Sequence, residues 1–113
     1  MCTTAQLREE IQNGKLDDRF KRVYVSEADV KAQYERYCSL ADDFDEVFSA
    51  DRDVRLFSAP GRTEVGGNHT DHNHGRVLAA GINLDAIAVA SKNDENIVRV
   101  KSRGYAMDIV DLS

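Results

Sequence analysis

The sequence predicts an α+β fold in which N-terminal helices are followed by a small, mostly antiparallel sheet. Apolar residues recur at helical spacing up to about residue 50 and at strand spacing after it. Glycine follows the same division, because six of the seven glycines come after residue 60. We therefore divide the chain into a helical N-terminal segment, residues 1–53, and a strand-loop-strand with a β-meander, residues 54–113.

Length and composition are those of one ordinary globular domain. The chain has 113 residues, of which 42% are hydrophobic and 31% charged, so it can bury a core of modest size. A net charge of -5 gives no electrostatic basis for binding nucleic acid. No apolar run reaches transmembrane length, and Cys2 and Cys38 form neither a disulfide framework nor a metal motif. We expect a cytoplasmic protein with no nucleic-acid and no membrane partner.

The helical segment contains two predicted helices and one ambiguous stretch. The first helix runs from about Thr4 to Asn13, and Gly14 stops it. Residues 16–25 alternate weakly and fit either a connection or a short helix. A longer helix begins at Ser26, which resembles the cap of a capping box. Its buried face is marked by apolar residues spaced three or four apart: Val30, Tyr34, Tyr37, Ala41, Phe44 and Phe48.

An acidic run, residues 42–46, lies inside the longer helix. We interpret it as a solvated face with no role in substrate binding. Asp42 and Asp43 mark a place where the helix could be interrupted.

The second segment is predicted to consist of strands. Residues 54–59 predict a strand that leads into a loop, and residues 76–78 predict the strand that leads out of it. Small and branched residues predict that 85–90 is a buried strand. A polar turn and Gly104 separate the later stretches. We expect an antiparallel meander made by residues 85–90, 97–101 and 107–110.

The loop between the first strands, residues 58–75, is the candidate functional site. It reads S-A-P-G-R-T-E-V-G-G-N-H-T-D-H-N-H-G and holds the only proline and all three histidines of the chain. Proline and glycine argue against a regular helix or central strand across it. Because polar and titratable groups are costly to bury, we interpret the loop as a site that the flanking elements present.

The residue types of this loop admit two chemical interpretations besides a polar turn that caps a sheet. The first is a metal site, because His69, Asp71, His72 and His74 are ligand types that zinc prefers. However, no histidine elsewhere could complete such a site, and both cysteines lie in the helical segment.

The second interpretation is a polyol or sugar site. Sugar hydroxyls both donate and accept hydrogen bonds, so they suit carboxylate and amide oxygens together with imidazole or guanidinium donors. Arg62, Asn68, His69 and Asp71 supply such a set.

The run from Pro60 to Gly75 resembles the galactose-binding signature of galactokinases, P-G-R-V-N-L-I-G-E-H-T-D-Y-N-G-G. Residues 77–90 resemble the strand that follows this signature, and Phe44 and Phe48 match an upstream F-x-x-x-F pattern. The resemblance covers residues 27–113. It implies that the chain is the N-terminal part of a ribosomal-protein-S5-like kinase domain, in the superfamily that also contains homoserine and mevalonate kinases.

The resemblance also implies an activity, the ATP-dependent phosphorylation of galactose or a related hexose at its anomeric hydroxyl. ATP and Mg²⁺ would be cofactors of the full-length enzyme, and this segment alone would bind neither. Arg62 matches the family's catalytic arginine beside the reacting hydroxyl, where it would stabilise charge. His69 and Asp71 match residues that bind the sugar, and Asn68 stands where the family has a sugar-binding glutamate.

The sequence departs from the family pattern in two ways. Asn68 replaces the glutamate and His72 a tyrosine, which leaves the identity of the sugar open. The family's Gly/Ser-rich phosphate loop is absent from these residues, as is a GxxxxGK[ST] motif. We therefore expect an incomplete kinase domain that is inactive alone and self-associates through an open sheet edge or face. The alternatives are a non-catalytic sugar-sensing module of the same family and, beyond it, the His/Asp metal site.

Overall fold

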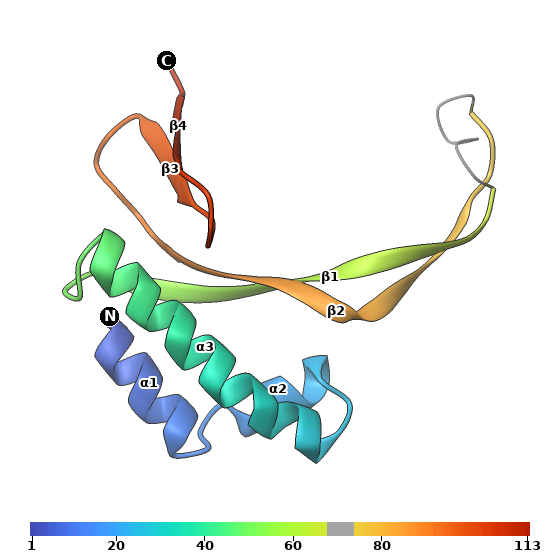
Figure 1. The fold of residues 1–113 in the computed structure, drawn as a ribbon, viewed down its shortest axis with the longest axis horizontal. Coiled ribbons are helices and arrows are strands. Elements are labelled where there is room, and N and C mark those ends of the chain that lie inside the picture. The colour runs from blue at the N-terminus through green and yellow to red at the C-terminus, as the bar shows by residue number, and fades with distance from the viewer. Residues whose placement is uncertain (68–73) are drawn as a thin grey trace.

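The computed structural model of the chain describes residues 1–67 and 74–113. Its elements follow the order α1 (Thr4–Gln12), α2 (Asp17–Val23), α3 (Glu27–Val47), β1 (Val54–Gly66), β2 (Leu78–Ser91), β3 (Ile97–Lys101) and β4 (Met107–Asp111). The helices form one group, and the long β1–β2 ribbon crosses them and extends beyond them (Figure 1). The predicted α+β class is confirmed. Within the described residues, no helix is both long and apolar enough to cross a membrane.

Both predicted helix starts are confirmed by their caps. The Thr3 hydroxyl accepts a hydrogen bond from the Gln6 N–H at 3.4 Å, and the Gln6 side chain accepts one from the Thr3 N–H at 3.0 Å. Ser26 Oγ accepts from the Asp29 N–H at 3.1 Å. These bonds satisfy N–H groups that the first turn of a helix leaves without partners. Gly14 follows α1 in the left-handed conformation, with a φ of +74°.

The apolar face predicted for the longer helix forms the centre of the core. On α3, Val30, Tyr37, Ala41 and Phe44 are buried, and the other two predicted residues of this face are half-buried. The ambiguous stretch is the short helix α2, whose Phe20 ring lies 5.0 Å from the Tyr37 ring between centroids. The rest of the core comes from the other elements: Leu7, Ile11, Tyr24 and Val54.

α3 continues unbroken through the acidic run, so the expected interruption is wrong. Asp42 and Glu46 are exposed, as expected of a solvated face, but Asp45 is half-buried against α1. Asp45 accepts from Thr4 Oγ1 at 2.5 Å and pairs with Arg8, and Asp42 pairs with the same guanidinium at 2.7 Å. Residues three apart share one face of a helix, and here that face is turned to α1. The run therefore attaches α1 to α3.

β1 and β2 form one antiparallel ribbon that pairs from Val54 opposite Ser91 to Gly66 opposite Leu78, with register shifts between Pro60 and Arg62 and between Glu64 and Gly66. β1 continues through Pro60 and across the first half of the predicted loop. The expectation of a loop is therefore wrong for this half, although β1 is not the central strand that proline and glycine argue against. In a two-stranded ribbon each strand is an edge, and edges and bulges are where a strand tolerates proline.

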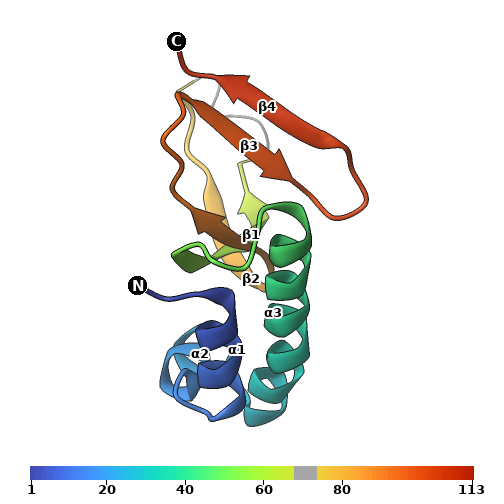
Figure 2. The ribbon, with the colours of Figure 1, turned by 90° about the vertical axis from the view of Figure 1, so that its left-hand side faces the viewer.

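Residues 85–90 lie within β2 and are not the buried strand that the sequence predicts. Asp85, Ile87 and Val89 are half-buried, whereas the alanines between them are exposed. The prediction fails because helices cover only one face of the ribbon (Figure 2). On the open face, Phe57 lies opposite Ala88 and is 55% exposed.

The predicted hairpin of β3 and β4 is confirmed, with Ile97 opposite Asp111, but the meander is wrong. β2 pairs with β1, and β3–β4 is a separate two-stranded sheet. The polar turn explains the separation. Asn93 Oδ1 accepts from the Glu95 N–H at 2.9 Å, and its amide donates to the Ile97 carbonyl at 3.2 Å. This local turn carries the chain away from the ribbon before β3 begins (Figure 2).

Candidate functional site

Arg62 is the one predicted sugar-binding residue that lies within the described part of the chain. It is on β1, opposite Gly81 of β2, and its side chain is exposed. Among the described residues there is no ion pair between Arg62 and Glu64, its near neighbour on the same strand. The guanidinium therefore stands on the ribbon surface without a carboxylate of its own strand to neutralise it.

The ribbon is irregular directly before Arg62. Pro60 pairs with Asp85 and Arg62 with Gly81, so three residues of β2 lie opposite the single residue Gly61. A Cβ at Gly61 would lie 3.1 Å from a side chain and 3.3 Å from a carbonyl oxygen of those three residues. Irregularities of this kind bend a strand and redirect its side chains. The direction in which Arg62 points is therefore set at this position.

Gly67 lies at the base of the loop and has a φ of +87°. A Cβ at this position would overlap the Arg76 carbonyl oxygen and would lie 2.9 Å from the Val77 Cα. Glycine alone meets both the conformation and the close approach of the backbones. Through Gly67 the chain that enters residues 68–73 lies beside the chain that leaves them.

The other predicted sugar-binding residues, Asn68, His69 and Asp71, lie outside the described residues, as does His72. His74 is described and exposed. Within residues 1–67 and 74–113, no group of three or more His, Cys, Asp or Glu side chains could hold a metal ion. The roles assigned to the loop residues, in a sugar site or a metal site, stay predictions.

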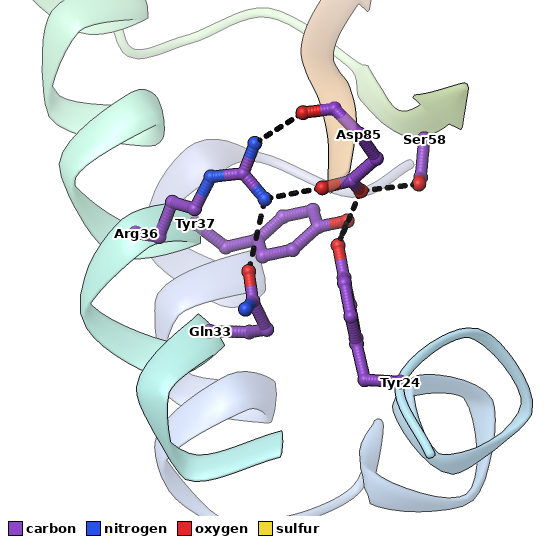
Figure 3. A network of polar contacts seen from close by, with 6 residues as sticks. All are labelled: Tyr24, Gln33, Arg36, Tyr37, Ser58 and Asp85. Carbon is purple, nitrogen blue, oxygen red and sulfur yellow. Dashed lines mark hydrogen bonds and ion pairs between the residues drawn. The ribbon is translucent and has the colours of Figure 1, made fainter. Parts of the chain in front are cut away.

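A polar network that sequence reasoning missed joins the helices to the ribbon (Figure 3). Asp85 of β2 accepts from Tyr24 Oη at 2.6 Å and from Ser58 Oγ at 2.5 Å. Arg36 of α3 donates through Nη1 to the Asp85 carboxylate at 2.6 Å and through Nη2 to the Asp85 carbonyl oxygen at 2.7 Å. The Tyr37 hydroxyl lies 2.8 Å from that of Tyr24. Residues from α2's end, α3, β1 and β2 thus converge on one carboxylate.

The surroundings of Asp85 determine its charge. Only 9% of its side chain is exposed. Burial acts to raise the pKa of the carboxyl group, but the hydrogen bonds from Ser58, Tyr24 and Arg36 outweigh burial and lower that pKa. Burial first, and then the bond to Asp85, raise the pKa of Tyr24. At neutral pH, Asp85 is therefore an anion and the Tyr24 hydroxyl a neutral donor.

The sequence contained one sign of this network. Asp85 is the only charged residue in the otherwise uncharged run 77–90. A charge on a partly covered strand is costly unless it is paired, so a partner was to be expected. Arg36 and Tyr24 are 49 and 61 residues away along the chain. No local spacing could have identified them.

The matched family and the relatives agree on one segment. Residues 42–92 match the family model described as the galactokinase galactose-binding signature. A galactokinase of Streptococcus mutans is 38% identical over 71 residues, which are 62% of this chain and 18% of that protein. A galactokinase of Staphylococcus saprophyticus is 40% identical over 62 residues, which are 55% of this chain and 16% of that protein. No solved structure matches the chain.

The matched residues cover less than a fifth of each of these relatives. Residues 42–92 include the last six residues of α3, the whole β1–β2 ribbon and the loop at its end. Arg62, Ser58 and Asp85 lie inside this segment, whereas the residues that bind Asp85 from the helices precede it. The chain carries, over residues 42–92, the galactose-binding signature of the galactokinase family.

Proposed function

We propose that this chain is the sugar-binding part of a galactokinase-type enzyme, which transfers the γ-phosphoryl group of ATP to the anomeric hydroxyl of galactose or a related hexose. The observation that carries the proposal is the match of residues 42–92 to the galactose-binding signature. This segment contains both the P-G-R run and the H-T-D run of the loop. The relatives that share it are named galactokinases.

Each residue of the proposed site has a role that fits its chemistry. Arg62 is proposed as the catalytic residue, because a guanidinium stays protonated and can stabilise negative charge beside the reacting hydroxyl. Its exposed position on β1 supports this role. Asp71 would accept hydrogen bonds from sugar hydroxyls, His69 would return one, and Asn68 could do either.

ATP and Mg²⁺ are proposed as cofactors of the full-length enzyme, with neither of them bound by this segment alone. Asp17 and Asp18 occupy the first turn of α2, and Glu27 and Asp29 that of α3. Negative side chains at a helix N-terminus repel a phosphate. The sequence contains no GxxxxGK[ST] motif. We assign no step to nucleotide-binding groups and propose that these 113 residues bind sugar without phosphorylating it.

A second candidate is a non-catalytic sugar-sensing module of the same family. Both candidates bind sugar through the same residues, so a binding measurement does not separate them. A phosphotransfer assay on the full-length gene product does, since only the enzyme forms a sugar phosphate.

We also propose that the 113-residue chain self-associates and that it is cytoplasmic. Large apolar side chains are exposed on the ribbon, Phe57 and Leu84 among them, and the outer edge of each described strand is unpaired. Cys2 and Cys38 are free thiols, as is usual in a reducing compartment.

The proposed site is tested by titrating the chain with galactose while the NMR signals of the histidine side chains are recorded. We expect a saturable shift of His69 that Asp71→Ala and Arg62→Ala abolish. Arg55→Ala is the matched control, because Arg55 is also an exposed arginine of β1 but lies before the matched P-G-R run. A folded chain that gives no shift at millimolar galactose or related hexoses would contradict sugar binding. Stoichiometric zinc in an elemental analysis would support the metal site in place of the sugar site.

A further inference from the structure

The Asp85 network lies where the helices hold the ribbon, just before the part of the ribbon that carries the signature loop. On the loop side of this position, residues 62–66 of β1 and 78–84 of β2 are exposed. The ribbon there runs out past the helices toward the loop (Figure 1). The network therefore stands at the root of the projecting part.

The network holds the main chain of the ribbon as well as its side chains. Arg36 Nη2 donates to the Asp85 carbonyl oxygen at 2.7 Å, which fixes β2 at this residue. Ser58 Oγ donates to the Asp85 carboxylate at 2.5 Å, which fixes β1 against β2 (Figure 3). Asp85 is also the residue paired with Pro60, at the edge of the irregularity that precedes Arg62.

Register in this ribbon needs such a clamp. A two-stranded ribbon is marginally stable by itself. Residues 62–66 of β1 and 78–84 of β2 are exposed on both faces, so no buried face specifies their register. A slip of one residue would turn each side chain of a strand to the opposite face. Such a slip would turn the Arg62 side chain to the face of the ribbon opposite the proposed ligand.

We propose that Asp85 is a positioning residue for the sugar site. Held by Arg36 and Tyr24, it fixes the ribbon register beside Pro60 and thereby sets the face on which Arg62 stands. The effect on sugar binding rests on the proposed function. The effect on the register of the ribbon is independent of it.

The register is tested without sugar, by amide hydrogen exchange on the 113-residue chain. Asp85→Asn keeps the size of the side chain and removes its charge. Asp45→Asn is the matched control, because Asp45 likewise binds an arginine and a hydroxyl, but both come from α1. We expect exchange in residues 61–66 and 78–84 to rise about 10-fold in Asp85→Asn, the factor that one hydrogen bond to a charged group is worth. In Asp45→Asn the rise should be in α1 instead.

Tyr24→Phe is a milder second variant, because it removes one hydroxyl from the network and leaves the ring in the core. It should show the same local pattern with a smaller increase. It keeps the test decisive if Asp85→Asn fails to fold. Exchange that rises evenly through the chain in Tyr24→Phe, or not at all in the ribbon, would overturn the positioning role.

The effect on the site is tested by galactose affinity in the same variants, at a temperature where each is folded. We expect affinity to fall on the order of 10-fold in Asp85→Asn, because small misplacements of a binding group cost this much or more. In Asp45→Asn it should stay within about 2-fold, the size expected of a change that does not touch the site. Equal losses in the two variants would reduce Asp85 to a general stabilising residue. If the unsubstituted chain binds no sugar, the proposed function fails, and the exchange pattern alone decides the positioning role.

Discussion

Arg36 and Asp85 are joined twice, from Nη1 to the carboxylate at 2.6 Å and from Nη2 to the main-chain carbonyl at 2.7 Å. A planar guanidinium that makes two bonds in different directions is fixed in orientation as well as in position. The pair ties α3 to the strand that leaves the signature loop. The stability of the joint between helices and ribbon and the geometry of the candidate site therefore depend on the same two residues.

The first prediction concerns the pH dependence of stability. Folding lowers the pKa of Asp85, so in acid the unfolded chain binds more protons than the folded one. The stabilisation is fully present above about pH 4, the ordinary pKa of aspartate, and is lost as the pH falls through the lower pKa of the folded state. Urea unfolding from about pH 7 down to about pH 2.5 should show the free energy of unfolding dropping below about pH 4.

The control for this prediction is Asp85→Asn, which should lose less stability over the acid range because it has no carboxyl group to protonate at this position. Asp45, whose pKa is also lowered in the folded chain, should account for part of the remaining slope. Parallel curves for the unsubstituted chain and Asp85→Asn would show that Asp85 is not paired as the structure has it.

A second prediction concerns the base of the loop. Gly67→Ala places a Cβ against the Arg76 carbonyl oxygen at a φ of +87° and should destabilise the chain by about 1–3 kcal/mol. Gly66→Ala is its control, because no atom lies within 4 Å of the Cβ that it would add. Thermal unfolding of the two variants measures the difference. A stable Gly67→Ala chain that binds galactose normally would contradict the close approach of the two strands.

The helices could be predicted from the sequence because their signals are local. The cap at Ser26 and the stop at Gly14 depend on neighbours within a few residues. Helix α2 stayed ambiguous because its seven residues bury only one side chain, that of Phe20. A single buried residue gives no helical periodicity to recognise. Helix α2 is placed in the core by contacts of Phe20 with residues of α3, which are distant in the sequence.

The strands were harder to predict because pairing is not local. The three stretches expected to form a meander have suitable spacing, yet the partner of β2 is β1, which lies on the other side of the loop. The sequence predicts a loop from residue 58 on, because it does not show that β1 is an edge strand where Pro60 is tolerated. In the candidate site, Arg62 could be chosen from its motif. The network at Asp85 could not, since its partners come from other elements.

A third prediction tests the part of α2 in the core. Phe20→Ala should cost about 3–5 kcal/mol, the usual loss when a large buried ring is truncated. The Phe20 ring is buried against the rings of Tyr24, Tyr34 and Tyr37. Val23→Ala is the control on the same helix, where the side chain is half exposed and the change should cost about 0.5 kcal/mol or less. Equal losses on urea unfolding would place α2 outside the core.

The last prediction concerns self-association through the open face of the ribbon. Phe57 is exposed there beside small alanines of β2, a surface to which another apolar surface can bind. Phe57→Lys should shift the chain toward monomer, because a lysine on this surface must be desolvated when two copies meet. Val25→Lys, at an exposed position between α2 and α3, should leave the association unchanged. Sedimentation velocity over a range of concentrations measures the association of both variants. If the unsubstituted chain is a compact monomer at high concentration, the proposed self-association is wrong.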